Sequence, residues 1–92
     1  MSLPIDVVLV GAPACHYCDD AQAILDDLGT RIPMTVRKVD LLSDEGRSLA
    51  VTHRIAFPPL LMVAGEYFGY GRISRRKLEK HLAALNITVE VT

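Results

Sequence analysis

The chain has 92 residues, half of them apolar, with two cysteines and no tryptophan. This length fits one small globular domain over residues 1–92 rather than two domains. Its 10 basic and 11 acidic residues nearly cancel, which argues against a nucleic-acid partner. No apolar stretch approaches the roughly 20 residues that a membrane span needs, so we expect no membrane association.

The first two predicted elements surround the cysteines. Residues 5–10, IDVVLV, are apolar on both faces of the pleat, which is typical of a strand buried between helices. Residues 11–13, Gly-Ala-Pro, end this strand. From Tyr17 onward, apolar residues recur at the spacing of an amphipathic helix that Gly29 closes: Ala21, Ile24, Leu25 and Leu28.

A second strand and a short helix are predicted next. Residues 32–41 alternate well enough for a strand, with a slip at the adjacent Arg37 and Lys38. Ser43 can cap a short helix that carries Leu49 and Val51. Gly46 lies inside this helix and lowers its propensity.

The last third of the chain predicts a hairpin and a helix. Residues 60–64 form a third strand, and residues 66–70 return beside it through a tight turn near Gly65. Ser74 can cap a final helix, and residues 86–92 have β character. The predicted fold class is α/β, in the order β-α-β-α-β-β-α, with a central mixed sheet flanked by helices. We interpret the basic residues near the last helix as a solvated face rather than a docking patch: Arg72, Arg75, Arg76 and Lys77.

Cys15 and Cys18 fall where the first strand gives way to the first helix. The start of a helix presents unpaired N–H groups and a partial positive charge, which stabilise a thiolate at Cys15. The thiolate is the form that attacks a disulfide. Cys18, one turn further on, can then bond to Cys15 and expel the reduced partner. We therefore assign Cys15 as the nucleophile and Cys18 as the resolving thiol.

The two residues between the cysteines can tune this pair. A protonated His16 would favour the thiolate and make the disulfide a better oxidant. Tyr17 can shield the sulfurs or contact a substrate. Asp19 and Asp20 act in the opposite direction, since a nearby negative charge disfavours a second anion.

A C-x-x-C pair also occurs at metal sites, which require further ligands elsewhere in the chain. Structural zinc normally takes four Cys or His ligands, and the chain has no second C-x-x-C. His16, His53 and His81 are scattered without ligand spacing. We favour redox chemistry in the cytoplasm, because two cysteines are too few for a secreted disulfide scaffold and the N-terminus lacks a basic leader.

A second motif lies at Pro58 and Pro59, immediately before the third strand. Tandem prolines are unusual there because proline cannot donate to a sheet ladder. An X-Pro bond adopts the cis form at low cost, and a cis Pro59 would turn the backbone of Pro58 and Leu60 outward beside Cys15. An extended substrate segment could then pair with that edge. The alternative is a rigid loop that only leads into the strand.

Three stretches resemble the thioredoxin-fold superfamily, and more narrowly its glutaredoxin-like dithiol members. CHYC (15–18) is similar to the C-P-Y-C of dithiol glutaredoxins, and residues 54–71 resemble their cis-proline segment, strand and turn. Residues 71–82 are similar to the last helix of thioredoxins. The resemblance implies one thioredoxin-like domain that exchanges thiols and disulfides, with substrate contacts at Tyr17, Pro58, Pro59, Leu60 and Gly71.

The chain also departs from both families. Ala12 stands where glutaredoxins usually carry a basic residue for glutathione, and their glutathione-binding aspartate is missing from residues 69–73. Ala14 replaces the tryptophan of thioredoxins, and Leu9 occupies the position of their buried aspartate. We expect no metal or organic cofactor, although glutathione can serve as a co-substrate.

We expect a monomer that acts on protein disulfides or glutathione, with glutathione or a reductase as electron donor. One alternative is a metal or iron–sulfur carrier of the glutaredoxin type, in which two copies share a cluster through Cys15 and external thiols. Another is a partner-binding module whose cysteines are idle.

Overall fold

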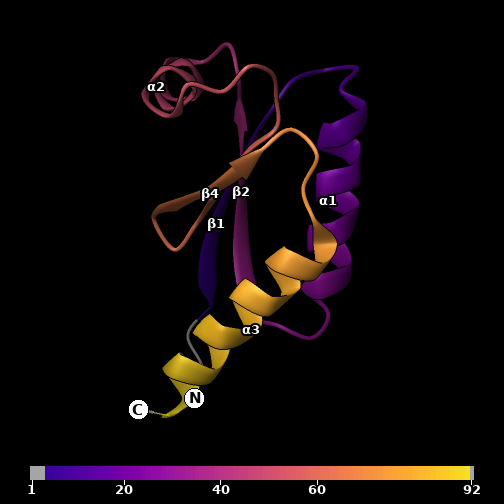
Figure 1. Cartoon of the computed structure of the whole chain (residues 1–92), viewed down its shortest axis with the longest axis vertical. Helices are drawn as coiled ribbons and strands as arrows, with labels where there is room; N and C mark the ends of the chain where they lie inside the picture. The colour runs from indigo at the N-terminus through magenta and orange to yellow at the C-terminus, as the bar shows by residue number, and fades with distance from the viewer. Residues whose placement is uncertain (1–3, 92) are drawn as a thin grey trace.

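A four-stranded mixed sheet organises the molecule. The computed structural model describes the backbone of residues 4–91 and the side chains of residues 4–86. Its elements follow the predicted order: β1 (Ile5–Gly11), α1 (His16–Leu28), β2 (Met34–Asp40), α2 (Asp44–His53), β3 (Leu60–Val63), β4 (Glu66–Tyr70) and α3 (Arg75–Val91) (Figure 1). The strands lie in the order β2-β1-β3-β4. Strand β2 is parallel to β1, whereas the β1–β3 and β3–β4 pairs are antiparallel. The predicted α/β fold class is confirmed.

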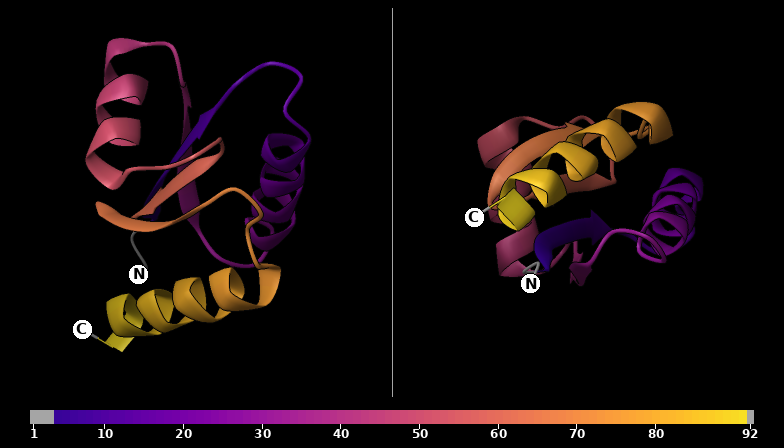
Figure 2. Two further views of the ribbon diagram at one scale, coloured as in Figure 1. Left: turned by 45° about the horizontal axis from the view of Figure 1, so that its top comes forward. Right: turned by 90° about the horizontal axis from the view of Figure 1, so that it is seen from below.

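Helices cover both faces of this sheet. On one face, alternate residues of β1 and β3 pack against α1 and α3 in the larger core cluster, which includes Val7, Leu25, Leu61 and Leu82. On the other face, Val10, Val39 and Leu60 form a smaller cluster, with residues at and after α2 packed against it. Figure 2 shows α1 and α2 on opposite sides of the sheet. Because both faces of β1 are covered, its sequence is apolar at nearly every position.

Local signals in the sequence form the expected caps and turn. The Ser43 side chain accepts the backbone N–H of Gly46 at 3.1 Å and caps α2. Ala64 and Gly65, with φ of 52° and 79°, make the two-residue turn between β3 and β4. A two-residue hairpin turn of type I′ requires positive φ at both of its central residues. Val51 lies in α2 as predicted, and its side chain is 76% exposed.

The end of the chain differs from the prediction. The β character of residues 86–92 does not produce a strand, because α3 continues to Val91. The β-branched residues there lower helix propensity by only a few tenths of a kcal/mol each, and no Gly or Pro stops the helix. The last residue of that stretch lies outside the described residues. Within residues 4–91, no helix is both long and apolar enough to cross a membrane.

Candidate active site

Cys15 is the N-cap of α1. Its backbone is extended, with φ of −110° and ψ of 106°, and its Sγ accepts the backbone N–H of Cys18 at 3.1 Å. The turn that brings Cys15 there passes through Ala14, whose φ is positive at 54°. The sulfur therefore lies at the positive end of the helix, where N–H groups favour a negative charge.

The structure brings the two predicted cysteines together in a disulfide. The Cα atoms of Cys15 and Cys18 are 5.2 Å apart, a normal separation for a disulfide. Cys15 is half-buried, whereas Cys18 is only 8% exposed and packs against Gly11. An incoming group can therefore reach the sulfur of Cys15 more easily than that of Cys18.

The tandem prolines lie beside the disulfide. The Pro58–Pro59 peptide bond is cis, and the Pro58 carbonyl oxygen is 3.9 Å from Sγ of Cys15. Pro58 has no N–H, so its backbone can accept a hydrogen bond from a substrate through the carbonyl oxygen but cannot donate one. The Leu60 side chain is fully buried in the smaller core cluster, so a substrate could contact this residue only through its backbone. The role of Leu60 in substrate binding stays a prediction.

Three partly exposed aromatic side chains surround this edge, and we call them the aromatic row: Tyr17, Phe57 and Tyr70. The ring centroids of Tyr17 and Phe57 are 6.2 Å apart, and those of Phe57 and Tyr70 are 5.6 Å apart in an edge-to-face arrangement. Each of these residues remains about two-fifths to one-half exposed, at 40%, 49% and 39%. Only Tyr17 was predicted from the sequence, because the other two rings come from a loop and an edge strand that only the fold brings together.

Gly71 lies against the Phe57 ring of the aromatic row. Its φ is 71°, and its N–H donates to the Pro59 carbonyl oxygen at 2.7 Å. A Cβ at this position would lie 2.8 Å from Cε2 of Phe57. Glycine therefore lets the Phe57 ring lie directly against the backbone beside the buried Pro59.

His16 lies on the solvent side of the disulfide. Its side chain is 88% exposed, and its Nε2 is 3.9 Å from Oδ2 of Asp20, one turn along α1. The structure therefore places the imidazole next to the cysteines in sequence but in open solvent. Its predicted effect on the redox potential stays a prediction.

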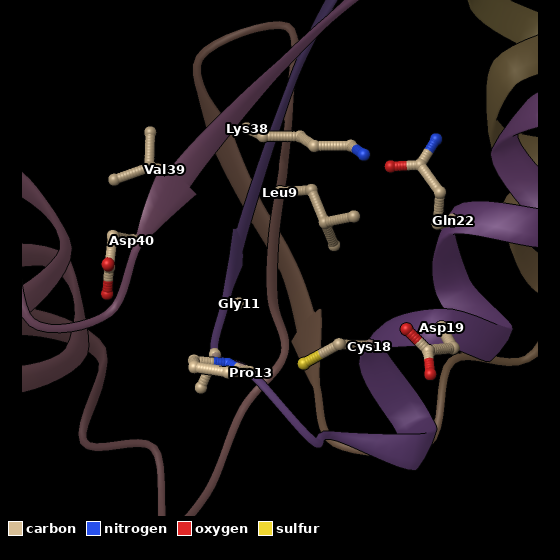
Figure 3. Close-up of a pocket in the computed structure, with 10 residues that line it drawn as sticks. Leu9, Gly11, Pro13, Cys18, Asp19, Gln22, Lys38, Val39 and Asp40 are labelled. Atoms are coloured by element: carbon tan, nitrogen blue, oxygen red, sulfur yellow. The ribbon is translucent and has the colours of Figure 1, made fainter.

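A pocket of about 330 Å³ lies on the other side of Cys18, between α1 and the ends of β1 and β2. Figure 3 shows Lys38 and Gln22 facing one another across it, with Leu9 between them and the sulfur. Because Leu9 is apolar and 4% exposed, β1 supplies no carboxylate beneath Cys18. The polar groups of this pocket come from Asp19, Gln22, Lys38 and Asp40, which sequence patterns did not single out together.

Metal ligands do not gather anywhere in the described part of the chain. No three His, Cys, Asp or Glu side chains among those residues are arranged to hold an ion. His53 instead stacks on Tyr67, with ring centroids 4.7 Å apart, and His81 contacts the ring of Phe68.

Comparison with known proteins identifies the fold. No family model matches the sequence, and no curated protein sequence matches it. Among solved structures, an uncharacterized thioredoxin-like protein from Clostridium perfringens superposes with a TM-score of 0.70 at 14% identity, over 97% of this chain and 76% of that one. A thioredoxin from Thermus thermophilus gives 0.60 at 23% identity, over 89% and 73%. Reduced Schistosoma mansoni thioredoxin gives 0.62 at 22% identity, over 90% and 80%. The chain therefore has a thioredoxin-like fold.

Proposed function

We propose that this protein is a small thiol–disulfide oxidoreductase. The observation that carries the proposal is the Cys15–Cys18 disulfide at the start of α1, with the first sulfur half-buried and the second covered. The neighbouring Pro58 carbonyl and the aromatic row provide a surface on which a substrate segment can lie. The thioredoxin-like fold supports this chemistry by resemblance.

The reaction proceeds in two exchanges. The Cys15 thiolate attacks one sulfur of a substrate disulfide, which forms a mixed disulfide and releases the other substrate sulfur as a thiolate that takes up a proton. The Cys18 thiol then loses its proton and attacks Sγ of Cys15, which re-forms the internal disulfide and releases the second substrate thiol. Two electrons pass to the substrate, and glutathione or a reductase returns them to the protein.

The substrates we propose are protein disulfides, in the cytoplasm, with glutathione as an alternative co-substrate. Tyr17 contributes contact surface, and His16 adjusts the redox potential. Equilibration against glutathione and a dithiol buffer measures that potential. A redox potential of about −270 mV would resemble that of thioredoxin, whereas a potential of roughly −200 to −230 mV would resemble those of glutaredoxins.

Two cysteine variants test the assignment. We expect Cys15→Ser to abolish reduction of insulin disulfides, because it removes the attacking sulfur. Cys18→Ser keeps the first exchange but prevents the second, so it should accumulate a mixed disulfide that intact-mass spectrometry detects. Full activity in Cys15→Ser would falsify the proposal. Purification without oxygen addresses the cluster-carrier alternative, since a coloured dimer would favour it.

A further inference from the structure

A groove leads away from the disulfide at Tyr17. It has a volume of about 640 Å³ and runs between α1 and the segment that enters α3. Eight residues line it: Tyr17, Asp20, Ala23, Ile24, Arg72, Ile73, Ser74 and Arg75. Tyr17 belongs to both this groove and the aromatic row, so a segment bound at Cys15 can continue into the groove.

The charged side chains in the groove differ in how well they are already paired. Arg75 binds Asp27, and Asp20 lies 3.9 Å from His16. Arg72 is exposed and has no ion-pair partner within the part of the chain that the structure describes. An acidic group that enters the groove therefore meets one guanidinium that is free to bind it. Arginine suits this role because its planar fork matches a carboxylate.

We propose that Arg72 is a specificity-determining residue that selects protein disulfides flanked by acidic side chains. The inference rests on the proposed function, and it changes our interpretation of Arg72 from part of a solvated helix face to part of a substrate groove. The substrate segment lies across the aromatic row, follows the half-buried Ile24 and buried Ile73 along the groove, and places a carboxylate against Arg72. Asp20, on the opposite wall, disfavours a second acidic group there.

Two peptides test this preference, and each contains one cysteine that is held in the same mixed disulfide. One carries a single glutamate and the other a single lysine at the same flanking position, and kcat/KM is measured for each. We expect wild-type protein to prefer the acidic peptide by about fivefold, the upper range for one exposed ion pair, and to lose the preference as salt rises. Arg72→Gln should abolish the preference for the acidic peptide, and Arg72→Glu should reverse it.

Arg47→Glu is the matched control. It makes the same change in charge at an exposed arginine on α2, which covers the other face of the sheet, so the wild-type ratio should persist. Equal rates for both peptides in the wild type, or an unchanged ratio in Arg72→Glu, would overturn the inference while leaving the oxidoreductase intact. If wild-type protein reduces neither peptide nor insulin, the proposed function fails, and the inference fails with it.

Discussion

The aromatic row depends on the absence of a side chain at Gly71. The positive φ of this glycine is costly for other residues, and a Cβ there would meet the outer edge of the Phe57 ring at 2.8 Å. The ring is 49% exposed and can swing aside. A substitution at Gly71 should therefore disturb the aromatic row more than it disturbs the fold.

We expect Gly71→Ala to lower the free energy of unfolding by about 1 kcal/mol through backbone strain. Displacement of Phe57 should also slow reduction of protein disulfides by roughly two- to tenfold, the range for the loss of an aromatic pair. Gly65→Ala is the control, because Gly65 has a φ of 79° and no atom within 4 Å of a new Cβ. It should lose similar stability and keep its activity. Equal activities of the two variants would show that the contact with Phe57 has no functional role.

Helix α2 approaches the end of β2 most closely at Gly46. A Cβ on this glycine would lie 2.1 Å from the carbonyl oxygen of Asp40, which belongs to the backbone and cannot swing away. The same glycine donates its N–H to the Ser43 cap. Gly46 therefore lowers the helix propensity of α2, but it also allows α2 to pack against the end of β2.

Gly46→Ala should destabilise the protein by about 3 kcal/mol, the upper part of the range for overpacking. Helix propensity alone predicts the opposite, a gain of about 1 kcal/mol. Urea unfolding monitored by circular dichroism measures the change. Ser48→Ala, at an exposed position of the same helix, is the control and should change stability little. A stabilised Gly46→Ala would contradict this packing.

Two surface ion pairs join α1 and its adjoining turn to α3. Asp27 binds Arg75, and Arg31 binds Glu79 at 3.0 Å. The hydrogen bond from Arg75, aided by its charge, holds the pKa of Asp27 below its ordinary value of 3.8. A carboxyl group whose pKa is lower in the folded state than in the unfolded state stabilises the fold at pH values above its unfolded-state pKa. That contribution is lost as pH falls through the folded value.

Asp27→Asn should therefore reduce the loss of stability between pH 7 and about pH 3, because it removes one carboxylate that acid must protonate. Both side chains are exposed, so the difference should be small and should shrink at high salt. Urea midpoints at the two pH values measure it. Asp44→Asn, at an exposed carboxylate on α2 with no ion pair among the described residues, is the control. The same pH response in wild type and Asp27→Asn would contradict the pairing.

Local chemistry explains which parts of this structure could be predicted from the sequence. The cap at Ser43, the turn at Gly65 and the strand-to-helix junction at Cys15 depend on neighbours in the chain, so residue type was enough. The aromatic row could not be predicted, because Phe57 and Tyr70 meet only after β3 and β4 pair. The same holds for the groove at Arg72, whose walls come from two separate elements. The helical end of α3 does not follow from residue type, because the β-branched residues there favour a strand although nothing in the sequence stops the helix.

The two core clusters of the molecule share one sheet. Leu25 lies in the larger cluster and Leu60 in the smaller one, and both side chains are almost fully buried, at 1% and 0% exposed. Strand β1 contributes to both clusters, through Val7 on one face and Val10 on the other. Loss of packing on either face should therefore destabilise the same cooperative unit.

We expect Leu25→Ala and Leu60→Ala each to lower the free energy of unfolding by about 3 kcal/mol, through lost burial and the cavity left behind. Each variant should unfold in one transition, with the wild-type dependence on urea and with circular dichroism and tyrosine fluorescence changing together. Exposed Leu42→Ala is the control and should cost far less, because that side chain is already 67% accessible to water. A second transition in Leu60→Ala alone would mean that α2 and its cluster unfold separately. In that case the sheet would not couple the two faces, and residues 1–92 would not behave as one cooperative domain.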